Sequence, residues 1–233
     1  MTIWFASGNM HKKEELAGIL SKAIPSEFTK AFEIKIPSDA GLVFNPRETG
    51  NSFLENALIK AAALYGLLEK SRHDGLLQAW LPGDPVIADD SGICVDAMKG
   101  RPGIHSARYR GQGKTSGDGN EPDAISDADR NALLLAELGD NPLRKSRFVC
   151  AMVLYYSHDR FFSAQESMEG ELVKKTEDSR GSGGFGYDPI LFIPELGRTV
   201  AELSGGEKNR LSHRGKAGRA IAGILFANNP LKS

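Results

Sequence analysis

The chain has 233 residues, of which 40% are hydrophobic and 25% are charged, enough apolar material for one sizeable domain or two lobes that share a core. Lysine and arginine together number 29, against 30 aspartate and glutamate residues. This balance excludes a general electrostatic attraction to a nucleic-acid polymer or to an acidic membrane surface, so any anion must be bound locally.

Neither the cysteines nor the apolar segments indicate an extracellular or membrane protein. Cys94 and Cys150 lie in apolar runs and lack the spacing of a metal site or a disulfide framework. No apolar run approaches the ~20 residues of a membrane span, and the start of the chain does not resemble a signal peptide. We therefore expect a soluble cytoplasmic protein that does not associate with membranes.

The first predicted elements are a strand over residues 2–6, a glycine-containing turn at 7–9 and a helix from 11 to about 23. Lys12 and Lys13 fall in the first helical turn, where the partial positive charge of the helix disfavours cations. A bound anion would resolve this conflict, because the turn and the helix N-terminus offer N–H donors. Solvated surface lysines are the alternative.

A strand is predicted at residues 32–36, and a second helix at 52–68 from an apolar stripe with steps of three and four. Lys60 lies on or beside the stripe that this helix buries. Its ammonium either reaches solvent at the edge of the core or points into a phosphate-binding cleft.

Residues 86–88 form a short apolar strand that ends in Asp89 and Asp90 and resumes at 93–95, which predicts a hairpin interrupted by a carboxylate pair. Because side chains alternate along a strand, the two carboxylates should face opposite ways. One of them, together with Glu48 in the turn before the second helix, would suit the oxygen coordination of Mg²⁺. A polar turn with an Asx cap is the alternative.

The remaining elements are a long exposed loop at 111–126, a third helix capped by Ser126 and Asp129, an antiparallel pair at 148–156 and 161–167, a strand at 187–193 and a closing helix. Single strands and hairpins between helices predict an α/β fold with a mixed sheet.

Phe185 and Tyr187 lie among glycines, which suits either close approach to a ligand or a hairpin corner. Basic residues gather again before the closing helix, as a second anion site or as scattered surface charge.

Six separated sequence blocks carry a family resemblance. They are SGNMHK at 7–12, ETGNSFLENALIKA at 48–61, IADDSG at 87–92, RPGIHSARY at 101–109, GGFGYDPI at 183–190 and SHRGKA at 212–217. In this order they resemble the non-canonical purine nucleoside triphosphate pyrophosphatases, the inosine triphosphatase family. Only the stretches at 69–84 and 111–126 are longer than is usual for that family.

The resemblance implies one domain over residues 1–233, an elongated α/β fold whose two lobes share a mixed central sheet, with the active site in the cleft between them. It also implies a homodimer. The site residues that it implies fall into three groups. The catalytic residues are Asp90 as proton acceptor, Lys60 and Asp89; the metal ligands are Glu48 and Asp90; and the substrate contacts are Ser7, Gly8, Asn9, Met10, His11, Lys12, Lys60, Ser91, Phe185, Gly186, Tyr187, Asp188, Lys208, His213 and Arg214.

The expected reaction is Mg²⁺-dependent hydrolysis of ITP, dITP or XTP to the monophosphate and pyrophosphate, which cleanses the nucleotide pool. Hypoxanthine and xanthine carry an acceptor at C6 where adenine carries an amino donor. Donors from His213, Arg214 or the backbone would therefore disfavour ATP, by a factor of ~10⁴ or more if the mismatched groups are buried.

Three other functions remain open from the residues alone. One is a phosphatase or pyrophosphatase for other nucleotides, such as modified pyrimidine triphosphates. Another is a nucleotide-binding regulator without turnover, in which Glu48 and Asp90 would be superfluous. An RNA-binding module is the least favoured, because the near-neutral charge provides no extended track for a phosphate backbone.

Overall fold

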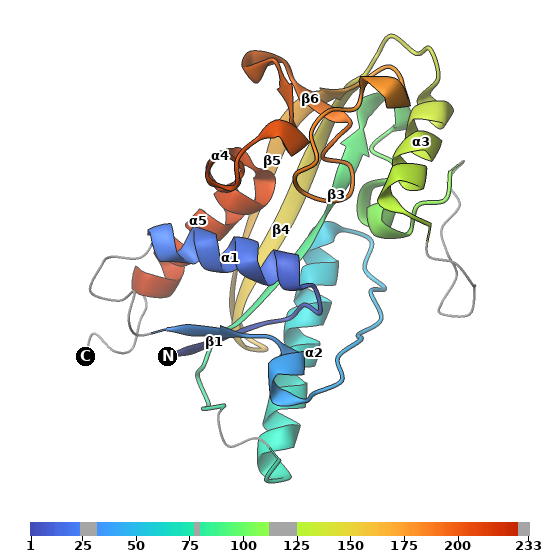
Figure 1. Ribbon diagram of the computed structural model, residues 1–233. Helices are drawn as coiled ribbons and strands as arrows, with labels where there is room; N and C mark the ends of the chain where they lie inside the picture. Colours follow the sequence, from blue (N-terminus) through green and yellow to red (C-terminus); the bar gives the residue numbers. More distant parts are fainter. Residues whose placement is uncertain (24–31, 77–79, 112–124, 228–233) are drawn as a thin grey trace. The chain divides into compact units, whose positions relative to one another are not determined.

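A computed structural model describes residues 1–23, 32–76, 80–111 and 125–227 (Figure 1). The helices are α1 (Met10–Ala23), α2 (Phe53–His73), α3 (Asp127–Leu138), α4 (Gly205–Leu211) and α5 (His213–Ala227). The strands are β1 (Thr2–Phe5), β2 (Glu33–Lys35), β3 (Val86–Val95), β4 (Lys145–Ser157), β5 (Arg160–Leu172), β6 (Leu191–Ile193) and β7 (Arg198–Thr199).

The strands form a seven-stranded sheet in the order β2-β1-β3-β4-β5-β6-β7. β1 runs parallel to both β2 and β3, whereas β6 runs antiparallel to both β5 and β7. The predicted α/β class with a mixed sheet flanked by helices is therefore confirmed. The chain divides into two compact units, one of residues 1–90, 150–166 and 213–233 and the other of residues 91–149 and 167–212. That these units make up a single domain stays a prediction.

In the first unit, the alternation of β1 separates two apolar clusters. Ile3 and Phe5 pack with α1 and α5, while Trp4 packs with α2. Helices α1 and α5 approach closely, since a Cβ on Gly218 would lie 2.8 Å from Cγ2 of Ile19. The sheet of this unit is thus covered on both faces, by α1 and α5 on one and by α2 on the other (Figure 1).

In the second unit, one cluster forms around α3. Leu134, Leu135 and Leu138 of this helix pack with Ile93 and Val95 at the end of β3. The helix begins as predicted, because the Ser126 hydroxyl accepts a hydrogen bond from the Asp129 N–H at 3.1 Å.

Several sequence predictions are wrong in detail. β3 is one continuous strand of ten residues and not a hairpin interrupted at Asp89 and Asp90. α2 continues to His73, five residues beyond the predicted end at 68, and only Leu191–Ile193 of the strand predicted at 187–193 is extended. Helix α4 was not predicted. Most of the predicted loop at 111–126 lies outside the described residues.

The continuity of β3 has a physical reason. Nine of its ten residues are buried, so the strand lies in the interior of the sheet, where charged groups persist only if they are paired. The turn-forming residues Asp89, Asp90, Ser91 and Gly92 suggest a break locally, but partners on other elements stabilise the extended form.

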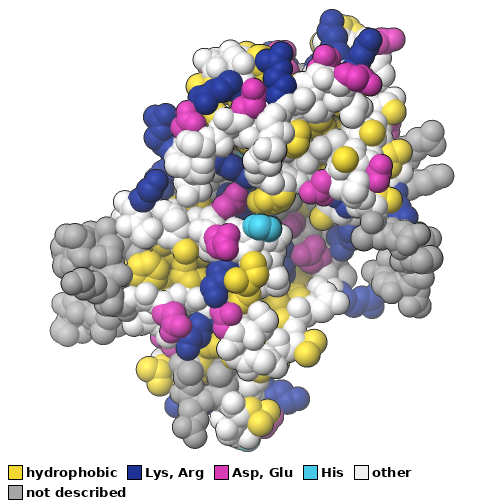
Figure 2. Space-filling model, in the orientation of Figure 1, with side chains coloured by type: hydrophobic (Ala, Val, Ile, Leu, Met, Phe, Trp, Pro, Cys, Tyr) yellow, Lys and Arg dark blue, Asp and Glu magenta, His cyan; other side chains and the backbone are white. Residues whose placement is uncertain are grey.

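Side chains of both charges are interspersed on the face shown in Figure 2, in keeping with the near-zero net charge. Among the described residues, no helix combines the length and the apolarity that crossing a bilayer requires.

Candidate active site

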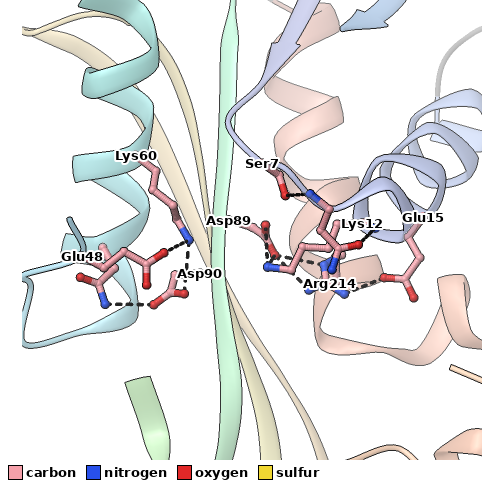
Figure 3. Close-up of polar contacts among 10 residues, drawn as sticks. Ser7, Lys12, Glu15, Glu48, Lys60, Asp89, Asp90 and Arg214 are labelled. Carbon is pink, nitrogen blue, oxygen red and sulfur yellow. Dashed lines mark hydrogen bonds and ion pairs between the residues drawn. The ribbon is translucent and has the colours of Figure 1, made fainter. Parts of the chain in front are cut away.

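Asp89 and Asp90 direct their carboxylates to opposite sides of β3, as the strand alternation predicted (Figure 3). Both side chains are buried, with 1% and 8% of their residue surfaces exposed. Each carboxylate meets a different set of cations, so the two acids belong to separate clusters.

The first cluster, here called the acid–lysine cluster, consists of Glu48, Asn56, Lys60 and Asp90. The Lys60 ammonium lies 2.9 Å from Oε1 of Glu48 and 3.4 Å from Oδ1 of Asp90 (Figure 3). The Asn56 amide donates to Oδ2 of Asp90 at 3.2 Å. The lysine is 8% exposed, so its charge is neutralised by these two carboxylates and not by solvent.

The turn before α2 brings Glu48 to this position. Ser52 caps the helix by accepting from the Glu55 N–H at 3.2 Å, and Asn56 accepts from the Gly50 N–H at 2.9 Å. A Cβ on Gly50 would lie 2.6 Å from Cβ of Glu55 and 2.8 Å from Oδ1 of Asn56, so the turn needs glycine there. Asn56 therefore links the turn that carries Glu48 to the Asp90 carboxylate.

Sequence reasoning did not select Asn56. Its signal was nevertheless present, because this amide sits beside Ala57 and Lys60 on the buried face of α2 and is 0% exposed. A polar side chain on an apolar stripe indicates a specific hydrogen-bonding role.

The ionisation of the acid–lysine cluster follows from burial and charge. Burial raises the pKa of Asp90, and the nearby Glu48 adds to this, while Lys60 acts in the opposite direction without cancelling it. Burial alone would lower the pKa of Lys60, but the attraction of Asp90, Asp89 and Glu48 outweighs it and the pKa is raised. Lys60 thus stays an ammonium, and Asp90 is a carboxylate of increased basicity.

The second cluster consists of Lys12, Glu15, Asp89 and Arg214. The Lys12 ammonium lies 3.3 Å from both Asp89 oxygens, and Nε of Arg214 donates to Oδ2 of Asp89 at 3.1 Å (Figure 3). Arg214 also pairs with Glu15 at 2.6 Å. Burial favours the neutral form of Asp89, but Lys12 and Arg214 outweigh this and hold the pKa of its carboxyl well below the ordinary range.

This pairing gives Asp89 a structural task, which is to hold Lys12 and Arg214 on the α1 and α5 side of β3. The predicted catalytic role of Asp89 stays a prediction. Glu15, the second partner of Arg214, was not predicted from the sequence, because no local pattern shows that a residue of α1 contacts the start of α5.

The turn at residues 7–12 is arranged by its own side chains. Ser7 accepts from the Asn9 N–H at 3.1 Å, and Asn9 caps α1 by accepting from the Lys12 N–H at 3.2 Å. Apart from its chain neighbours, no described residue has an atom within 4 Å of a Cβ built on Gly8, and His11 is exposed. The expected conflict at the helix start is relieved by carboxylates of the protein, Asp89 for Lys12 and, at 2.6 Å, Asp39 for Lys13.

A third cluster lies in the second unit. The Lys208 ammonium pairs with Asp188 at 2.8 Å and lies 4.7 Å from the centre of the Phe185 ring, a cation–π arrangement. Asp188 also accepts from the Phe185 N–H at 3.0 Å. Gly184 has φ +78°, and a Cβ on it would lie 2.0 Å from Oδ2 of Asp188, so only glycine fits this corner.

Four further predicted substrate contacts lie close to residues of these clusters along the chain. Ser91 follows Asp90 in β3 and is half-buried, and His213 opens α5 with 6% of its surface exposed. Met10 begins α1 and is 50% exposed, whereas Tyr187 is buried and donates to the Ser106 carbonyl at 2.8 Å.

The acid–lysine cluster offers two carboxylates to a hard divalent cation, which is fewer ligands than such an ion needs. Among the described residues, no three His, Cys, Asp or Glu side chains form a group that would hold a metal ion. Glu48 and Asp90 do converge, since both lie within ion-pair distance of Lys60. Mg²⁺ characteristically takes one or two carboxylates and fills its remaining positions with water and phosphate oxygens, so this pair is suitable.

Comparison with known proteins gives one consistent result. The model of the Ham1 family matches residues 3–224. The chain is 44% identical to the dITP/XTP pyrophosphatase of Treponema denticola over 217 residues, covering 93% of this chain and 94% of the relative. It is 41% identical to the dITP/XTP pyrophosphatase of Methylococcus capsulatus over 226 residues, covering 95% of this chain and 94% of the relative.

Solved structures agree with this result. A HAM1 protein from Coxiella burnetii superposes with a TM-score of 0.72 at 32% identity, covering 97% of this chain and 99% of that one. The Staphylococcus aureus Ham1 protein gives a TM-score of 0.71 at 30% identity, covering 98% of this chain and 100% of that one. On the sequence blocks, the mixed sheet and these matches, the chain belongs to the Ham1 family.

Proposed function

We propose that this chain hydrolyses non-canonical purine nucleoside triphosphates, namely dITP, XTP and ITP, to the monophosphate and pyrophosphate, and so removes them from the nucleotide pool. The observation that carries the proposal is the Lys60 ammonium between two carboxylates, 2.9 Å from Glu48 and 3.4 Å from Asp90. A cation for phosphate oxygens thus lies beside two oxygen ligands for a metal. The relatives named above, which are dITP/XTP pyrophosphatases, supply the substrate class.

Glu48 and Asp90 would hold the divalent ion, which we propose to be Mg²⁺. When bound, the ion supplies positive charge for the phosphate oxygens of the substrate. Two carboxylates face one ammonium here, so the cluster keeps a net negative charge that a divalent ion would offset.

Asp90 would accept the proton of the attacking water. The Asn56 amide, which donates to one carboxylate oxygen at 3.2 Å, restricts the orientation of the group, as a positioned base requires. Lys60 would stabilise the charge that develops on the phosphates, and no covalent intermediate is needed. The reaction is therefore general-base hydrolysis of the bond between the α and β phosphates.

The remaining predicted residues would bind the substrate. Residues 7–12 and Lys208 would contact the phosphates, and Ser91 would contact the nucleotide. Residues 185–188 with His213 and Arg214 would surround the base, where the Phe185 ring offers a stacking face. Donors directed at C6 favour the oxygen of hypoxanthine and xanthine over the amino group of adenine.

We also propose that the enzyme acts as a homodimer in the cytoplasm. The resemblance to the inosine triphosphatase family supports the dimer, and light scattering of the purified chain tests it directly. A mass equal to one chain over the working concentration range would remove this part of the proposal.

The reaction is tested with a panel of triphosphates that contains dITP, XTP, dATP, dGTP and a modified pyrimidine triphosphate. Each is incubated with Mg²⁺ or with EDTA, and pyrophosphate and phosphate are measured separately. We expect Mg²⁺-dependent release of pyrophosphate from dITP and XTP and little from dATP. Equal turnover of dATP, a preference for the pyrimidine, or binding without turnover would each contradict the proposal.

A further inference from the structure

Both the backbone N–H and the backbone carbonyl of Gly186 form hydrogen bonds with side chains of helix α3. Its N–H donates to Oδ2 of Asp127 at 2.7 Å, and its carbonyl accepts from Nδ2 of Asn131 at 3.1 Å. The two side chains are four residues apart and so lie one above the other on the same face of the helix. We call these two hydrogen bonds the α3 clamp.

An asparagine at position 131 does not favour the packing of α3, because an amide is costly to bury on the apolar face of a helix. Its position continues the buried stripe of Leu134, Leu135 and Leu138, and the residue is 6% exposed. Among the described residues, its Oδ1 atom has no hydrogen-bond partner. An apolar side chain would avoid the cost of burying this amide, so the hydrogen bond to Gly186 is the interaction that accounts for asparagine here.

Residues on both sides of Gly186 carry the third cluster. Phe185 immediately precedes it, and Asp188, the partner of Lys208, follows two positions later. Gly186 has φ +64°, so the chain turns sharply here, and a shift of this peptide would move the ring and the carboxylate together. The hydroxyl of Tyr187, bonded to the Ser106 carbonyl at 2.8 Å, fixes the next residue as well.

We propose that Asp127 and Asn131 are positioning residues that set the base selectivity of the enzyme. They would touch neither substrate nor metal, but they fix the segment 185–188 that would face the base. The inference rests on the proposed function, because it takes that segment as the base-binding one. It predicts that loss of the α3 clamp affects discrimination between bases more than the hydrolytic step.

The decisive variant is Asn131→Leu, which removes the donor but continues the apolar stripe. We expect its melting temperature to equal or exceed that of the wild type, while KM for dITP rises about tenfold with kcat changed less than about threefold. The dITP/dATP ratio of kcat/KM should fall by a similar factor. Asp127→Ala should act in the same direction, and Asp127→Asn, which keeps an acceptor for the Gly186 N–H, should restore most of the selectivity.

Ser126→Ala is the matched control, since it removes the cap of α3 without touching Gly186. We expect it to lower the melting temperature and to leave the dITP/dATP ratio unchanged. If it reduces the ratio as much as Asn131→Leu does, helix stability explains the effect and the inference is overturned.

Hydrogen exchange of the peptide that covers residues 183–188 gives a second readout independent of turnover. It should be faster in Asn131→Leu and unchanged in Ser126→Ala. If the wild type hydrolyses dITP selectively but Asn131→Leu and Asp127→Ala keep its ratio and its exchange rates, only the inference is overturned. If the wild type does not hydrolyse dITP, the proposed function itself fails and the inference falls with it.

Discussion

Asp89 and Asp90 are adjacent in β3, yet their carboxylates lie on opposite faces of the strand and serve different cations (Figure 3). Asp89 is bonded to Lys12 and Arg214, whereas Asp90 is bonded to Lys60 and Asn56. Their pKa values move in opposite directions. Burial raises the pKa of Asp89, but Lys12 and Arg214 outweigh it and lower the value, whereas burial and Glu48 raise the pKa of Asp90 more than Lys60 and Asn56 lower it. Asp89 thus stays ionised and anchors two cations, while Asp90 is the residue that we propose as the base.

Replacement of Asp90 by asparagine tests the base. Asp90→Asn should reduce kcat for dITP by roughly 10²–10⁴-fold, the usual contribution of a general base. The variant keeps a carbonyl oxygen for the Asn56 amide, and Lys60 keeps Glu48 at 2.9 Å, so the protein should remain folded. Steady-state kinetics and thermal unfolding measure both effects, and a variant with near-normal turnover would remove the role.

Asn56→Ala tests the link between Asp90 and the turn that carries Glu48. The change leaves the Gly50 N–H without its acceptor and frees Asp90, and it should cost about 1–3 kcal/mol of stability. It should also raise the Mg²⁺ concentration needed for half-maximal activity. Asn51→Ala, in the same turn but exposed, is the control and should change neither quantity. Equal metal activation curves for wild type and Asn56→Ala would argue against the link.

Asp89→Asn tests the buried ion pairs. Removal of one partner leaves Lys12 and Arg214 with uncompensated charge and should lower the free energy of unfolding by about 3 kcal/mol at pH 7. The folded pKa of Asp89 is depressed, so its contribution is complete above the unfolded value of 3.8 and is lost as pH falls below it. The difference between wild type and variant should therefore stay constant down to about pH 5 and shrink below about pH 4.

Urea unfolding at several pH values provides this measurement. The control is Asp96→Asn. Asp96 pairs with Arg147 at 2.6 Å, but the side chains of Asp96 and Arg147 are 49% and 37% exposed. Such an exposed pair should contribute less than about 1 kcal/mol. A difference for Asp89→Asn as small as the control's would show that the buried pairs do not stabilise the fold.

Gly184→Ala tests the corner that holds Asp188. The residue has φ +78°, and the new methyl group would collide with the Asp188 carboxylate, so we expect a stability loss of about 1–2 kcal/mol and a higher KM for dITP. Gly197→Ala is matched in backbone, at φ +62°, but within the described part of the chain its Cβ would meet nothing within 4 Å beyond the adjacent residues. It should lose about 1 kcal/mol, less than Gly184→Ala because it adds no collision, with an unchanged KM. A KM effect of equal size in both variants would contradict the assignment.

The sequence predicted the parts of the fold that depend on local patterns. The apolar stripe of α2, the Ser126 cap of α3 and the opposite directions of Asp89 and Asp90 follow from periodicity and capping, and the structure has them. The sequence-based prediction was wrong where tertiary contacts override local conformational preference. Asp89 to Gly92 carry turn signals, but side chains supplied by α1, α2 and α5 pair with the two carboxylates and stabilise an extended strand there.

The candidate site shows the same limit. Lys60 stood out because a charge on a buried stripe is visible in the sequence, whereas Asn56, Glu15 and Asn131 depend on partners that are distant along the chain. The resemblance to a family supplied roles for individual residues, and it did not contain the hydrogen bonds that connect them.

The identity of the two products formed from dITP tests the central claim most directly. Wild-type enzyme with Mg²⁺ should convert dITP to dIMP and pyrophosphate in equal amounts, and Asp90→Asn, folded and stable, should form neither at a comparable rate. Release of dIDP and phosphate, or the same product pair at the same rate from Asp90→Asn, would contradict the assignment of Glu48, Lys60 and Asp90 as the hydrolytic centre.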